Sequence, residues 1–194
     1  MQKKLPRLIV RPATVILCVT LTALEGSVLA LVPFLASLFH ELGHLALMFV
    51  LGVRVDEVEL TVFGAEIRTL PMTVGCAAQV AVYASGAVAN LLSSAVVLAA
   101  FGRTFGARFF AACSVSLALL NLLPIRTLDG GCVLETLLSR LAPIHSDTVF
   151  AAISGITLFV LWLGAAYLLL VCGGNLSLML FCAYLFITLY MTAK

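Results

Sequence analysis

The chain has 194 residues, of which 63% are hydrophobic and 10% are charged, and its formal net charge is +2. A soluble domain is roughly half apolar and a quarter charged, so this composition excludes a soluble enzyme or binding module and predicts an integral membrane protein. The net charge of +2 says little about partners, and no basic patch indicates nucleic acid, so we expect no nucleic-acid partner.

Six apolar stretches approach the length of about 20 residues that a helix needs to cross a bilayer. They lie at residues 9–24, 27–51, 76–101, 107–123, 148–171 and 176–192. The basic start of the chain is similar to a signal peptide, but it lacks a convincing cleavage site and is expected to remain as the first span. We therefore predict an all-α polytopic membrane protein with about six transmembrane helices in one domain, residues 1–194.

The distribution of basic residues predicts the orientation of these spans. If the N-terminus is cytoplasmic, only Arg103 and Arg108 fall outside, and the other nine Lys and Arg residues lie inside or at the inner edge. The positive-inside rule then places both termini in the cytoplasm. We expect a multi-pass protein of the cell membrane in which residues 40–44 lie toward the cytoplasmic side.

The segment between the second and third spans has a different pattern. Apolar and polar residues alternate from Val55 to Val62, and Gly64 separates this run from a second short one, residues 65–70. Alternation with a glycine break predicts a small membrane-associated β-hairpin. An ordinary connecting loop is the alternative.

The second span carries an HExxH motif, "HELGH", at residues 40–44. On a helix, His40 and His44 stack one turn apart and can bind one metal ion, while Glu41 lies beside that ion and can take a proton from bound water. An ionisable group in a bilayer costs at least about 2.5 kcal/mol, so such groups usually serve a function. The alternative is a polar cluster that holds helices together.

A catalytic zinc ion needs a third protein ligand and an open position for water. Four side chains outside the motif are candidates: Asp56, Asp129, His145 and Asp147. Asp129 follows the fourth span at the expected depth, because Pro124 ends or breaks that span and Gly130 and Gly131 allow a close backbone approach. We expect one Zn²⁺ ion with Asp129 as its third ligand and Glu41 as general base.

Three segments together resemble a known family. "HELGH" at 40–44, "GAVAN" at 86–90 and "NLLPIRTLDG" at 121–130 are similar, in order and spacing, to motifs of the site-2 protease family of intramembrane zinc metalloproteases (peptidase family M50). The bacterial branch of the stage IV sporulation protease, which processes a pro-sigma factor, looks most similar. The resemblance covers residues 9–135.

The resemblance implies zinc ligation by His40, His44 and Asp129, with Glu41 as the catalytic acid/base. It also marks three further motif residues: Asn90, Asn121 and Pro124. The two asparagines are expected to steady the substrate backbone or the ligand loop by hydrogen bonds, and a role in helix–helix contact is the alternative.

The predicted enzyme is a zinc metalloendopeptidase that cuts in or near a membrane segment of another protein. Its catalytic core is expected at about residues 27–135, with accessory helices at 9–24 and 148–192 and no PDZ or CBS domain, hence no nucleotide. The resemblance implies regulated intramembrane proteolysis in sporulation: the substrate is a pro-sigma factor or other membrane-tethered protein, and a membrane protein regulates the enzyme. The alternatives are an inactive zinc-binding scaffold and, less favoured, a metal or proton transporter.

Overall fold

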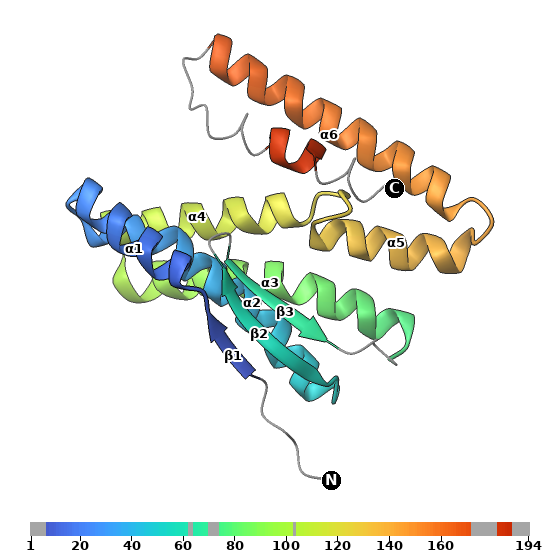
Figure 1. Cartoon of the computed structure of the whole chain (residues 1–194), viewed down its shortest axis with the longest axis horizontal. Helices are drawn as coiled ribbons and strands as arrows, with labels where there is room; N and C mark the ends of the chain where they lie inside the picture. The colour runs from blue at the N-terminus through green and yellow to red at the C-terminus, as the bar shows by residue number, and fades with distance from the viewer. Residues whose placement is uncertain (1–6, 62–63, 70–73, 103, 172–181, 188–194) are drawn as a thin grey trace. The chain divides into compact units, whose positions relative to one another are not determined.

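A computed structural model describes residues 7–61, 64–69, 74–102, 104–171 and 182–187 (Figure 1). The chain divides into two compact units, Met1–Leu120 and Asn121–Lys194.

The first unit combines helices with a small sheet. Its strands are β1 (Arg7–Val10), β2 (Val55–Thr61) and β3 (Gly64–Thr69). Its helices are α1 (Pro12–Glu25), the 3₁₀ helix η1 (Val28–Leu31), α2 (Val32–Val50), α3 (Cys76–Phe101) and α4 (Phe105–Asn121). Pro12 begins α1, where a missing N–H costs nothing, and Gly26 ends it in the left-handed region at φ 59°.

The three strands form one sheet in the order β1-β2-β3 (Figure 1). β2 runs antiparallel to β3, with Val58 opposite Ile67, and parallel to β1, with Val58 opposite Leu8. The guanidinium Nε of Arg11 pairs with the buried Glu59 carboxylate at 2.5 Å and so ties the start of α1 to β2.

The structure is mostly helical, and β1 adds a strand that the sequence does not predict. Residues 9 and 10 belong to β1, whereas the sequence places them in the first span. Four residues are too few to show a strand pattern, and their partner β2 lies far away in the sequence, so local periodicity cannot detect the pairing.

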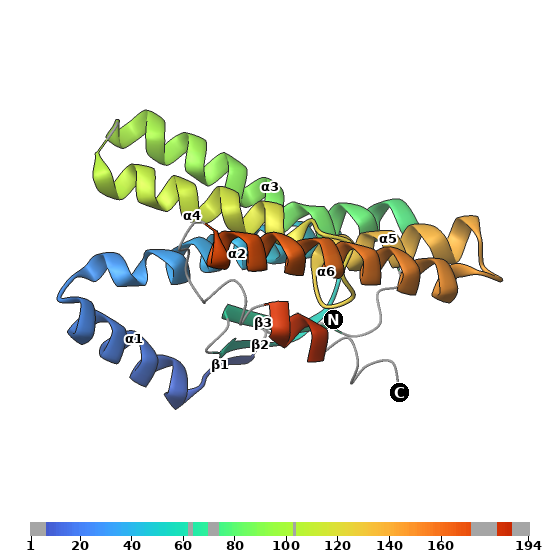
Figure 2. The same ribbon diagram turned by 90° about the horizontal axis from the view of Figure 1, so that it is seen from above.

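α2 and α3 pack closely because Gly43 has no side chain. A Cβ atom at Gly43 would lie 2.5 Å from the carbonyl oxygen of Ser85 and 2.6 Å from the Cβ of Ala89. α4 begins four residues after α3 ends and runs back in the opposite direction (Figure 2).

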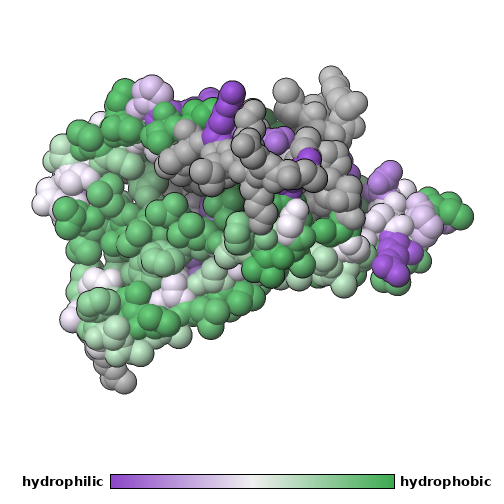
Figure 3. Space-filling model, turned by 90° about the horizontal axis from the view of Figure 1, so that it is seen from below, coloured by the Kyte–Doolittle hydropathy of each residue, from purple (hydrophilic) through white to green (hydrophobic). Residues whose placement is uncertain are grey.

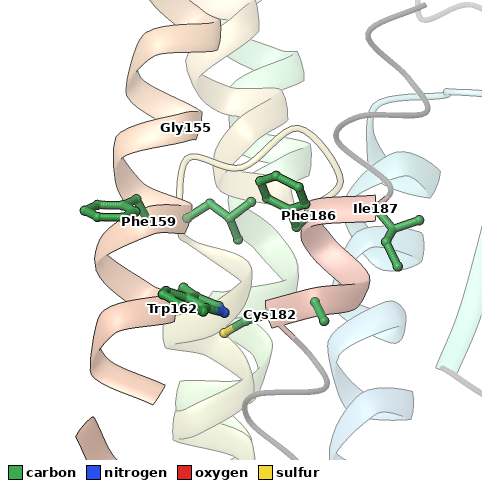
Figure 4. Close-up of a pocket in the computed structure, with 8 residues that line it drawn as sticks. Gly155, Phe159, Trp162, Cys182, Phe186 and Ile187 are labelled. Atoms are coloured by element: carbon green, nitrogen blue, oxygen red, sulfur yellow. The ribbon is translucent and has the colours of Figure 1, made fainter. Parts of the chain in front are cut away.

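The second unit contains α5 (Asp129–Leu141), α6 (Ser146–Leu170) and a helical segment at 182–187. Its buried core consists of Ile125, Leu158 and Leu185. An apolar pocket of about 470 Å³ is lined by Phe159 and Trp162 from α6 and Phe186 from the 182–187 segment (Figure 4). None of its lining residues is charged.

Within the described residues, three helical segments are long and apolar enough to cross a membrane: Val28–Val50, Cys76–Phe101 and Ser146–Leu170. The apolar helices Pro12–Glu25 and Phe105–Asn121 are shorter. The predicted sixth span, 176–192, lies largely outside the described residues, so the count of six stays a prediction. Hydrophobic side chains cover most of the coloured surface in Figure 3, as expected for helices that contact lipid.

Candidate metal centre

The two histidines of the HExxH motif lie on the buried face of α2. Their exposed fractions are 4% for His40 and 6% for His44, although α2 is otherwise almost wholly apolar. Their Nε2 atoms are 3.2 Å apart. Two ring nitrogens that can act as metal ligands therefore lie close together, as the four-residue spacing predicts.

A backbone carbonyl of α3 fixes the tautomer of His44. Nδ1 of His44 lies 2.8 Å from the carbonyl oxygen of Val82, and that oxygen can only accept a hydrogen bond. Nδ1 therefore carries the proton, and Nε2 keeps its lone pair. The Ser85 hydroxyl also donates to the Val82 oxygen, at 2.6 Å. This second contact holds in place the acceptor that orients His44.

Gly86 and Asn90 complete the wall that α3 presents to the two imidazoles. A Cβ atom at Gly86 would lie 2.7 Å from both Nε2 and Cε1 of His40 and would overlap Nε2 of His44. The Asn90 side chain is fully buried, and its Nδ2 lies 3.3 Å from Nδ1 of His40. Val82, Gly86 and Asn90 recur at four-residue intervals, so they lie on one face of α3.

The spacing of the two rings requires a hydrogen-bonding proton or a metal ion between their Nε2 atoms. Because Nε2 of His44 has a lone pair, a second lone pair on Nε2 of His40 at 3.2 Å would be repelled unless a proton or a metal ion lay between them. Imidazole nitrogen is a common zinc ligand. The α2–α3 pair thus offers two pre-oriented ligands.

Glu41 follows His40 on α2 and is half-buried. One residue along a helix turns the side chain about 100°, so Glu41 lies on the face beside the two histidines. A carboxylate at this position can exchange a proton with water near their Nε2 atoms.

Asp129 lies in the second unit, as the first residue of α5. Its carboxylate is half-buried at a helix N-terminus, where the helix dipole stabilises a negative charge. The next residues, Gly130 and Gly131, are buried against the backbone of the preceding loop: a Cβ at Gly130 would lie 2.6 Å from the Leu123 carbonyl oxygen. Its role as the third ligand stays a prediction.

The loop before Asp129 is held by α6. The Ser154 hydroxyl donates to the Pro124 carbonyl oxygen at 2.7 Å, and the Arg126 guanidinium lies 5.1 Å from the centre of the Phe150 ring. Ile125, the residue between Pro124 and Arg126, is fully buried. Pro124 therefore lies in an anchored turn, and Ser154 is a positioning residue that sequence motifs miss because it is a lone serine in an apolar span.

Asn121 is the last residue of α4. Its predicted role in hydrogen bonding to the substrate or to the loop stays a prediction.

The other candidate ligands lie elsewhere and are exposed. Asp56 is on β2, His145 occupies the N-cap position of α6, and Asp147 lies in the first turn of that helix. An acidic residue in a first helical turn is stabilised by the helix dipole, so a structural role accounts for Asp147.

Cys132 follows Asp129 by one helical turn and is half-buried. Burial, with smaller contributions from the Asp129 and Glu135 carboxylates, raises the pKa of Cys132 to about 11. At neutral pH its side chain is therefore an uncharged thiol, which is a poor nucleophile.

Comparisons with known proteins bear on the family and the fold. The sequence pattern of Peptidase family M50 matches residues 103–164, which include the Asp129 loop but not the histidine motif. Among solved structures, the fold is similar to "Site-2 Protease from Methanocaldococcus jannaschii", with a TM-score of 0.62 and 16% identity over 100% of this chain and 94% of that chain. No curated protein matches the sequence. The chain thus has the fold of a site-2 protease and a partial match to the M50 pattern.

Proposed function

We propose that this protein is an intramembrane zinc metalloprotease of the site-2 type, which hydrolyses a peptide bond in or near a membrane segment of another protein. One observation carries the proposal: two buried histidines in an apolar helix direct their Nε2 atoms to one point, 3.2 Å apart, with Glu41 beside them. The M50 match and the site-2 protease fold support it.

Zinc fits the groups that the chain offers. Val82 leaves the lone pair of His44 on Nε2, the atom that faces His40. The sequence motifs imply Asp129 as the third ligand beside the two histidines, and two imidazoles with one carboxylate are a known catalytic zinc ligand set. We assign Asp129 as the third ligand, which leaves one position for water.

Bound zinc would lower the pKa of a ligated water toward neutrality. Glu41 would act as general base: its carboxylate would take a proton from the attacking water as the water oxygen adds to the peptide carbonyl carbon. It then gives the proton to the departing amide nitrogen, so that the C–N bond breaks into a carboxylic acid and an amine.

The substrate is a membrane or membrane-associated protein, since a water-dependent site within apolar helices is accessible only to chains at the membrane. We place the catalytic core at residues 27–135, the active site toward the cytoplasm and both termini in the cytoplasm, following the distribution of basic residues. A pro-sigma factor or similar tethered regulator as substrate, and a membrane protein as regulator, rest on the resemblance of the sequence motifs.

Removal of the metal tests the proposal. The purified protein in detergent should contain about one zinc per chain and cleave a panel of model membrane substrates; 1,10-phenanthroline should abolish cleavage, and added Zn²⁺ should restore it. Zinc and cleavage would be measured on the same samples. Zinc without cleavage of any substrate would instead indicate a scaffold, and zinc flux into vesicles a transporter.

A further inference from the structure

Asn90 has a buried side-chain amide, and only one of its two polar atoms makes a hydrogen bond among the described residues. Its Nδ2 lies 3.3 Å from Nδ1 of His40, while its Oδ1 has no hydrogen-bond partner among the described residues. A buried acceptor without a partner destabilises the folded state, so it calls for a functional explanation.

The three distances are compatible with the following order of protons. Since Nδ1 of His44 donates to the Val82 oxygen, Nε2 of His44 accepts a hydrogen bond from Nε2–H of His40 at 3.2 Å. Nδ1 of His40 then has the lone pair and accepts from Asn90 Nδ2. Two neutral imidazoles can adopt this order without a metal.

Metal binding requires the other tautomer of His40. Nε2 of His40 must give up its proton to offer a lone pair, and the ring stays neutral only if Nδ1 gains one. Nδ1–H then needs an acceptor, and the neighbouring Asn90 Nδ2 cannot accept. Oδ1 of the same amide can accept this hydrogen bond after the amide group rotates by about 180°.

We propose that Asn90 is a positioning residue that serves both tautomers of His40: its Nδ2 donates to the ring before the metal binds, and its Oδ1 accepts from the ring afterwards. The inference rests on the proposed function of the site. An asparagine is suited to this role because its amide presents a donor and an acceptor of nearly equal shape. Outer-shell partners of this kind change metal affinity by about 10–100-fold.

Three variants separate this role from simple packing. Asn90→Asp keeps the acceptor and should bind zinc at least as tightly as wild type, whereas Asn90→Leu keeps the volume without the acceptor and should bind about 10–100-fold more weakly. Ser94→Ala is the matched control, because the buried Ser94 hydroxyl donates only to Leu91 of its own helix among the described contacts. Its zinc affinity should be unchanged. Affinities would be measured by competition with a chromogenic chelator.

The tautomer can also be observed directly. In the His145→Gln protein with ¹⁵N-labelled histidine, one Nε2–H signal should be replaced by an Nδ1–H signal when Zn²⁺ is added. If the wild type takes up no zinc, the proposed function and this inference both fail. If it takes up zinc but His40 keeps Nε2–H, or Asn90→Leu binds as tightly as wild type, the role of Asn90 alone is wrong.

Discussion

Replacing Gly86 with alanine is expected to abolish stable zinc binding and, with it, cleavage. The added methyl group would lie 2.7 Å from Nε2 of His40 and would overlap Nε2 of His44. Both rings would have to move, and the atoms that move most are the two metal ligands. A displacement of about 1 Å in a catalytic site costs about 100-fold in rate.

The same substitution at Gly106 on α4 is the matched control, because a Cβ there would meet only Leu29 Cδ2, at an ordinary 3.8 Å. Alanine is a better helix former than glycine, so neither variant should lose its helix. Zinc content by mass spectrometry and thermal unfolding in detergent would be measured on both. A Gly86→Ala protein with one zinc per chain and full activity would show that the imidazoles do not bind metal where the structure directs them.

Gly130→Ala is expected to reduce cleavage by about 100-fold or more. The new Cβ would overlap the Leu122 backbone and lie 2.6 Å from the Leu123 carbonyl oxygen, and neither can swing aside as the end of a side chain could. The turn that precedes Asp129 would therefore open. We expect weaker zinc binding as well, since the third ligand would be displaced.

Gly164→Ala serves as the control for this second variant, because nothing lies within 4 Å of a Cβ at that position on α6. Its cleavage rate and zinc affinity should match those of the wild type. If Gly130→Ala also matched the wild type in both measurements, the tight turn would not position a ligand.

The histidine pair could be predicted from the sequence because the pattern is local. Four-residue spacing on a helix determines that His40 and His44 share a face, and the apolar surroundings indicate that they are buried. The structure confirms that their donor atoms converge. The Gly130–Gly131 pair likewise predicts a close backbone approach. In the structure the two glycines lie against the backbone carbonyls of residues 122, 123 and 125.

The supporting residues could not be predicted in the same way, because their roles depend on contacts between distant segments. The Val82 oxygen is a backbone atom, so no residue type marks its bond to His44. Ser154 and Pro124 are 30 residues apart in the sequence. Asn90 is a polar residue in an apolar helix, which indicates a role, but only the packing of α3 on α2 shows that its partner is His40.

The central claim is that Glu41 performs acid–base chemistry beside a metal that the histidines hold. The most direct test measures cleavage of one substrate and zinc content for the wild type and for Glu41→Gln, an isosteric change that removes only the proton acceptor. We predict a loss of about 10²–10⁴-fold in cleavage rate with zinc content unchanged. Wild-type cleavage by Glu41→Gln would contradict the account.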